Sequence, residues 1–190
     1  MSGLERFERM VPDDAARDAA LIREAIAAAG AGPAQSEQAA DLTITLVFGR
    51  TSEEVYGVCI GVAAYALDAV RALNADPKVD RPPDTGVWTL GHLRPALADE
   101  EPEPITAGPP RRVVTGRRTV DPGERFAYDF TTAFEARPEP GDDETVSLFN
   151  GLAVQGIAVV TYGVSHLIKH VAAVTERALA LHLKPAGGPT

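Results

Sequence analysis

The spacing of apolar residues predicts helices in the first part of the chain. After Pro12 and two aspartates, small apolar residues recur every three or four positions up to Gly30, a pattern typical of a capped amphipathic helix. A second helix start follows at Thr51, where two glutamates begin a segment that stays apolar for about six turns, to Leu73. We therefore expect a helical part over residues 12–75.

Two details of this part affect the fold class. Residues 42–48 alternate large apolar side chains with threonine and valine, which favours a β-strand, with a helix from Ser36 as the alternative. Residues 55–62 are apolar on every side of a helix. We expect the helix that contains them to be buried or packed in an oligomer.

The middle of the chain is rich in proline, unlike the part before it. Residues 76–110 contain eight prolines, which prevent long helices and predict an extended connection. We expect its middle, with Trp88 and His92, to dock on the core. Residues 111–137 then predict a β-hairpin that turns at Asp121-Pro122-Gly123-Glu124. Its second strand places four aromatic side chains on one face: Phe126, Tyr128, Phe130 and Phe134.

Residues 142–183 carry apolar side chains at steps of three and four. This seam predicts a long C-terminal helix, or two stacked helices broken near Gly163. We expect a disordered tail over 184–190. The whole chain is therefore predicted to be a single α+β domain over residues 1–190, mainly helical, with a small antiparallel β-sheet formed by the hairpin 111–137 and a long C-terminal helix.

Composition limits the classes of function. The 190 residues include 27 acidic and 18 basic ones, a net charge of −9, so general nucleic-acid binding is not expected. A single cysteine excludes an intrachain disulfide, and the N-terminus lacks a signal-peptide pattern, which favours a cytoplasmic location. The charge-free stretch 145–165 is long enough to cross a membrane, but glycines and polar residues interrupt it, so we expect protein to bury it.

The best candidates for chemistry are histidines. His166 and His170 are spaced to share a metal ion on one helix face, and His92 is a candidate third ligand. The alternative places the pair on a solvated helix edge beside Lys169. One early histidine, with Trp88 nearby and a later HxxxH pair, resembles the arrangement of DinB-like metalloenzymes. That resemblance implies a metal-dependent enzyme, although this chain has a longer N-terminal part than that family.

Other enzyme signatures are absent from the sequence. It contains no phosphate-binding loop, dinucleotide glycine motif, HExxH or nucleophile elbow, which favours a protein without catalysis and leaves a divalent metal as the only cofactor suggested. A cluster of arginines is a candidate partner-binding patch, with cross-strand pairing to Asp129 and Glu135 as the alternative. The cluster consists of Arg111, Arg112, Arg117 and Arg118.

Together these patterns predict a non-catalytic, homo-oligomeric assembly or adaptor protein. Its long apolar helices would associate with a second copy, because one small domain cannot easily hide two of them. Its β-hairpin and Pro-rich loop would engage a protein partner. The alternatives are a metal-dependent enzyme or metal-binding protein that uses His166 and His170, and a module that binds a small apolar ligand.

Overall fold

A computed structural model of the chain describes residues 12–95 and 121–183, and over these residues the protein is all-α. The described part contains no strand, so the predicted α+β class is wrong. Its elements are α2 (Pro12–Gly30), the short 3₁₀ helix η1 (Pro33–Gln35), α3 (Ser36–Val47), α4 (Ser52–Ala75), α5 (Leu90–Leu93), α6 (Pro122–Ala136), α7 (Asp143–Ala153) and α8 (Ile157–Leu183).

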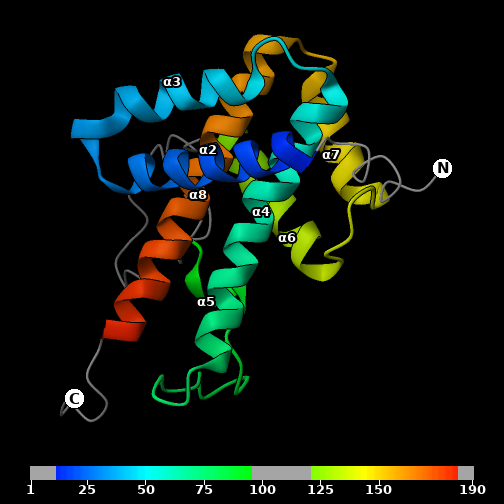
Figure 1. Cartoon of the computed structure of the whole chain (residues 1–190). Helices are drawn as coiled ribbons and strands as arrows, with labels where there is room; N and C mark the ends of the chain where they lie inside the picture. Colours follow the sequence, from blue (N-terminus) through cyan, green and yellow to red (C-terminus); the bar gives the residue numbers. More distant parts are fainter. Residues whose placement is uncertain (1–11, 96–120, 184–190) are drawn as a thin grey trace, which may run out of the picture.

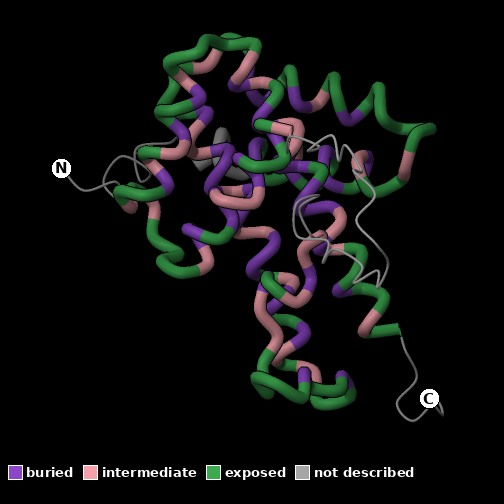
Figure 2. The backbone as a smooth tube through the Cα atoms, turned by 180° about the vertical axis from the view of Figure 1, so that it is seen from behind, coloured by how far each residue is buried: buried purple, intermediate pink, exposed green. Residues whose placement is uncertain are grey.

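The two longest helices, α4 and α8, pack against each other along the centre of the molecule. They begin at the same end, and His182 near the end of α8 lies 3.0 Å from Asp76, which caps the end of α4. α6 packs along α8, α7 lies beside the starts of both long helices, and α2 and α3 form a hairpin across α8 (Figure 1). Buried residues concentrate where these helices meet (Figure 2).

The all-round apolar segment of α4 is covered within the chain itself. Its buried side chains include Val55, Val58, Cys59, Ile60 and Val62. A capping box at Thr51 begins this helix, as the sequence predicts: Thr51 Oγ1 accepts from the Glu54 amide, and the Glu54 carboxylate accepts from the Thr51 amide. Oligomerisation is therefore not needed to hide this segment of α4.

The strand predicted over residues 42–48 is wrong: residues 42–47 belong to helix α3, and Phe48 caps its end. The side chains of Ala39, Thr43, Leu46 and Val47 are buried on one side, which is helical spacing. The two threonines that suggested a strand satisfy their hydroxyls inside the helix, since Thr43 donates to the Ala39 carbonyl and Thr45 to that of Asp41. The alternative, a helix from Ser36, is confirmed.

The described part of the predicted hairpin, residues 121–137, is helix α6. Phe126, Phe130 and Phe134 are spaced four residues apart. This spacing places them on one face of a β-strand and equally on one face of an α-helix. The residues expected to form the hairpin turn begin the helix instead: Asp121 caps the amides of Gly123 and Glu124, and Pro122 occupies the first turn. The remaining hairpin residues, 111–120, lie outside the described part.

The C-terminal seam forms two helices, and the break lies at Gly156 rather than at Gly163. Gly156 has φ of +98°, a left-handed conformation that ends the turn between α7 and α8. Gly163 lies inside α8, where a Cβ atom would come within 2.5 Å of Leu152 Cδ1. Its missing side chain therefore lets α7 approach α8 closely.

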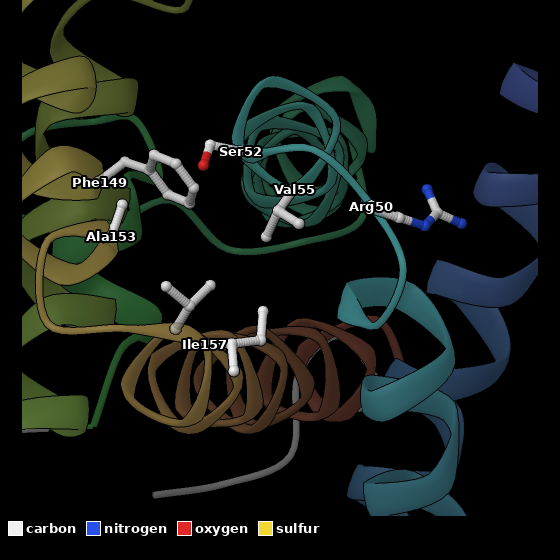
Figure 3. A pocket seen from close by; sticks show the side chains of 7 residues that line it. Arg50, Ser52, Val55, Phe149, Ala153 and Ile157 are labelled. Carbon is white, nitrogen blue, oxygen red and sulfur yellow. The ribbon is translucent and has the colours of Figure 1, made fainter.

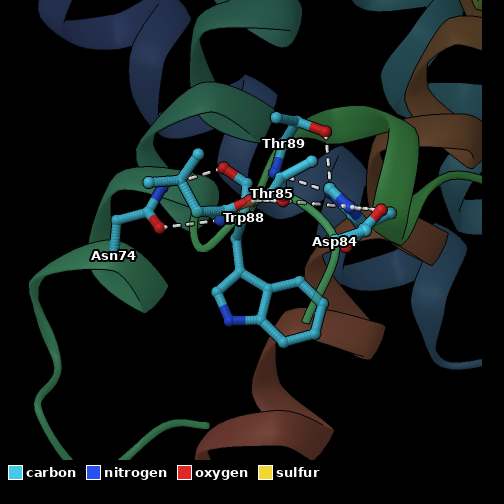
Figure 4. A network of polar contacts seen from close by, with 7 residues as sticks. Asn74, Asp84, Thr85, Trp88 and Thr89 are labelled. Carbon is cyan, nitrogen blue, oxygen red and sulfur yellow. Dashed lines mark hydrogen bonds and ion pairs between the residues drawn. The ribbon is translucent and has the colours of Figure 1, made fainter. Parts of the chain in front are cut away.

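The described part of the Pro-rich connection docks on the end of α4, as predicted. The Asn74 side chain donates to the Trp88 carbonyl and accepts from the Trp88 amide (Figure 4), while Trp88 Nε1 donates to the Asp80 carbonyl. Trp88 packs against the hydrophobic core. Residues 96–110 and the tail 184–190 lie outside the described part.

Candidate functional site

The three candidate metal ligands have separate surroundings. His92 contacts neighbouring residues of its own segment: its Nδ1 lies 2.8 Å from Thr89 Oγ1 and its Nε2 lies 3.4 Å from Asp84 Oδ2. His166 and His170 lie on α8, against different parts of α6. In residues 12–95 and 121–183, no three His, Cys, Asp or Glu side chains gather in an arrangement that could hold a metal ion. The described geometry therefore offers no support for the metal hypothesis or for the DinB-like resemblance.

His166 contacts the beginning of α6. Its Nε2 lies 3.8 Å from Asp121 Oδ1, its ring centre is 4.5 Å from that of Tyr162, and the Tyr162 hydroxyl donates to Asp121 Oδ2 at 2.5 Å. Burial lowers the pKa of His166, and the Asp121 carboxylate opposes this shift. Because Asp121 also caps α6, the cluster joins the start of that helix to α8.

His170 is buried rather than on a solvated edge. Its Nε2 lies 3.4 Å from Thr131 Oγ1, and its ring meets that of Tyr128 edge-on. Burial lowers the pKa of His170 to about 4, and the positive charges of Arg94 and Arg177 lower it further. The side chain is therefore neutral at pH 7 and fills space in the core.

The arginine cluster, Arg111, Arg112, Arg117 and Arg118, lies outside the described residues. Its predicted cross-strand partners are engaged elsewhere. Asp129 pairs with Arg125 Nε at 2.8 Å, one turn away on α6, and Glu135 accepts from the Leu90 amide at 2.7 Å. Pairing of these acidic residues across a hairpin is therefore wrong.

The single cysteine is not a reactive group. Cys59 is fully buried among apolar residues of α4, and burial raises the pKa of its thiol to about 12. The thiolate, which is the nucleophilic form, is negligible at neutral pH.

A cleft of about 170 Å³ opens where α4 and α8 begin and α7 ends. Val55 of α4 and Ile157 of α8 face each other across it, with Phe149 of α7 on one side (Figure 3). The hydroxyl group of Ser52 contributes polar surface to the lining of the cleft. The complete lining consists of Arg50, Ser52, Val55, Phe149, Ala153, Ile157 and Val160.

Arg50 does not give this cleft a free positive charge. Its guanidinium is directed away towards α2 (Figure 3), where both terminal nitrogens donate to the Asp18 carboxylate at 2.6 Å. The Arg50 and Asp18 side chains are 17% and 11% exposed, so the pair is largely shielded from water and holds α2 against the α3–α4 turn. The cleft is lined by both polar and apolar surface, and because Asp18 engages the Arg50 guanidinium, an anionic ligand has little to recognise in it.

The turn that follows α7 is the second notable feature of this end. Val154 is 84% exposed and Ile157 is 48% exposed, in a stretch, residues 145–165, that has no formal charge. We call the exposed residues at the end of α7, in this turn and at the start of α8 the neutral surface; they are Asn150, Gly151, Val154, Gln155, Gly156, Ile157 and Ala158. The charge-free stretch was visible in the sequence, but the expected burial applies only to part of it.

By length and composition alone, two helices of the described part, Ser52–Ala75 and Ile157–Leu183, are long and apolar enough to cross a membrane. Half of the most apolar window of each is buried inside the protein, as in the core helices of globular proteins. No protein-family model, no curated protein and no solved structure matches the chain. The functional argument therefore rests on the neutral surface and the cleft beside it.

Proposed function

We propose that this protein is a non-catalytic, homo-oligomeric assembly protein that associates with a second copy through its neutral surface. The observation that carries the proposal is the exposure of Val154, at the end of α7, and of Ile157, the first residue of α8. Single exposed apolar residues are common on monomers. Here they adjoin a cleft and lie within an uncharged stretch, and this lack of charge matches the charge-depleted centre of protein interfaces.

The lack of charge on the neutral surface, and not the charge of the whole chain, is what is compatible with a second copy as the partner. Each copy carries a net charge of −9, so two copies repel each other over most of their surfaces. In a symmetric dimer the same patch meets itself, so a charged patch would face like charge. The neutral surface avoids that cost within the contact itself.

The proposal keeps only part of what the sequence predicted. The β-hairpin is not available as a partner-binding element, because residues 122–136 form a helix that packs on α8. Engagement of a further protein partner by the Pro-rich loop and the arginine cluster stays a prediction from the sequence. Self-association through the neutral surface requires neither segment.

A single charge on the neutral surface tests the proposal. We expect Val154→Asp to convert the wild-type oligomer to a monomer, because association would place two new carboxylates in an apolar contact. Light scattering coupled to gel filtration at tens of micromolar measures the mass directly.

Leu179→Asp is the matched control for this experiment. Leu179 is on α8 and 57% exposed, but lies about 33 Å along the helix from Ile157 of the neutral surface. We expect this variant to keep the wild-type mass. Dissociation by Leu179→Asp but not by Val154→Asp would contradict the assignment of the interface.

A further inference from the structure

The short helix α5 begins with the same kind of cap as α4, but a histidine takes the place of the glutamate. At α4, Thr51 is followed three positions later by Glu54, whose carboxylate accepts from the Thr51 amide. At α5, Thr89 is followed three positions later by His92, whose Nδ1 accepts from the Thr89 amide at 3.2 Å. A carboxylate accepts this hydrogen bond at neutral and mildly acidic pH alike, whereas an imidazole accepts it only while neutral.

The hydrogen bonds of His92 define its protonation state in the structure. Because the Thr89 amide can only donate, Nδ1 carries no proton, and the ring proton of the neutral side chain is on Nε2. Nε2 lies 3.4 Å from Asp84 Oδ2 and 3.5 Å from Thr85 Oγ1, two oxygens that can accept (Figure 4). The structure therefore holds His92 as the neutral tautomer with its proton directed to Asp84.

We propose that His92 is a pH-sensitive cap of α5, which holds the Thr89 amide while the ring is neutral and releases it when the ring is protonated. A proton on Nδ1 turns this atom from an acceptor into a donor. The imidazolium keeps two partners, the Thr89 hydroxyl at 2.8 Å from Nδ1 and the Asp84 carboxylate, so only the amide loses its acceptor. Because Thr89 is half-buried, its amide regains a partner only when the start of α5 moves towards water.

Asp84 favours the protonated state of this cap. It is the acidic side chain of the described part that pairs with His92, and it is 65% exposed, whereas the His92 side chain is 21% exposed. The pKa of Asp84 is lowered, first by a hydrogen bond from its own backbone amide and in part by His92. Asp84 is therefore ionised throughout the range in which histidines take up a proton.

The other charged groups on the elements around α5 already bind other atoms. Arg81 donates to Asn74 of α4, Arg94 to Thr132 of α6 and Arg177 of α8 to the Leu93 carbonyl, while Glu135 of α6 accepts from the Leu90 amide. His170 of α8 has a pKa of about 4, so it stays neutral at mildly acidic pH. These groups keep their charge while His92 changes its own.

The movement is confined to the beginning of α5. Leu90 and Leu93 are each 1% exposed and keep the helix on the core. Trp88, the single tryptophan of the chain, comes directly before the cap, and its ring meets that of His92 edge-on with 5.8 Å between the ring centres. Its fluorescence therefore reports on this part of the molecule alone.

Tryptophan fluorescence of the full chain tests the proposal between about pH 7.5 and about pH 5. In the wild type we expect the Trp88 emission to move to longer wavelength in one titration step as the pH falls, because the indole gains contact with water. His92→Gln is the matched variant, since glutamine at this position of a capping box accepts from the amide but does not titrate. Its emission should stay constant over the same range.

Hydrogen exchange of the Thr89 amide, followed by NMR and corrected for the intrinsic effect of pH, measures the release directly. We expect exchange about fivefold faster at the acidic end of the range in the wild type, which is what the loss of one helix cap corresponds to. Asp84→Asn removes the partner of the imidazolium from an exposed position. In this variant the transition should move to lower pH, with the exchange at about pH 7.5 unchanged.

The outcomes decide for or against the cap. The same pH dependence of Trp88 emission and Thr89 exchange in the wild type and in His92→Gln overturns the proposal. Thr89 exchange in the wild type that stays constant, after correction, across the range also overturns it. If His92→Gln does not fold, the wild type and Asp84→Asn give the answer, because an unchanged midpoint in Asp84→Asn contradicts the assigned pairing. Since α5 lies near the ends of α4 and α8, away from the neutral surface, the result is independent of self-association.

Discussion

At the scale of single residues, His170 couples the stability of the fold to pH. Its pKa is lowered to about 4 in the folded chain, from the ordinary value of 6.5, because it is buried against Thr131 and Tyr128 and faces the positive charges of Arg94 and Arg177. Between these two values the unfolded chain binds a proton that the folded chain does not. The contribution of His170 to stability is therefore complete above pH 6.5 and is lost as the pH falls towards 4.

This shift predicts a loss of up to about 3 kcal/mol of unfolding free energy between pH 7.5 and pH 4 from His170 alone. Urea unfolding at a series of pH values measures it. The matched variant is His170→Gln, which cannot take up a proton and should lose less stability over the same range. A smaller dependence remains in this variant, because burial also lowers the pKa of His166. Identical pH dependence in both proteins would contradict the buried neutral state of His170.

At the scale of elements, the packing of α7 on α8 depends on Gly163. A Cβ atom at this position would lie 2.5 Å from Leu152 Cδ1, whereas one at Gly151 of α7 would meet nothing within 4 Å. Both glycines are in helices, where alanine is intrinsically preferred by up to about 1 kcal/mol. The two positions therefore separate helix propensity from packing.

We expect Gly163→Ala to destabilise the protein by about 1–3 kcal/mol, because Leu152 or α7 itself must move to admit the methyl group. Gly151→Ala should instead stabilise it by about 0.5–1 kcal/mol. Chemical denaturation of the two variants beside the wild type provides the comparison. A gain in stability for Gly163→Ala would show that α7 does not pack against α8 at this point.

The elements that the sequence predicted correctly are those with distinctive ends. The helix at Ser52–Ala75 follows from its capping box, and that at Pro12–Gly30 from its acidic start and final glycine. The helix at Pro122–Ala136 was missed because its aromatic residues fit both periods. Its start, an aspartate followed by a proline and then a glutamate, resembles a tight turn as much as a helix cap.

The candidate site was harder to predict than the helices. A cleft formed by Ser52, Phe149 and Ile157 joins residues about one hundred positions apart, and local periodicity does not report such contacts. For the histidine pair, the sequence predicted the correct local spacing but suggested a shared metal site that the described residues do not show. The i, i+4 spacing of His166 and His170 was correct on α8, but their separate partners, Asp121 and Thr131, depend on how α6 crosses that helix.

At the scale of the whole molecule, the net negative charge of the chain opposes self-association, whereas the apolar contact of the proposed interface favours it. Two copies of charge −9 repel, and Glu53 and Glu54 at the start of α4 add to the negative charge near the cleft. Salt screens this repulsion, since the screening length falls from about 10 Å at 0.1 M to about 3 Å at 1 M, while an apolar contact is not weakened. Self-association should therefore strengthen as sodium chloride is added. An interface built on ion pairs would weaken under the same conditions.

Sedimentation equilibrium of the wild-type chain, over a range of concentrations and at low and high salt, tests self-association most directly. The account predicts a mass rising with concentration to about twice the 20.1 kDa of one chain, and a dissociation constant that falls as salt is added. A mass that stays at 20.1 kDa at every concentration and salt level would contradict it.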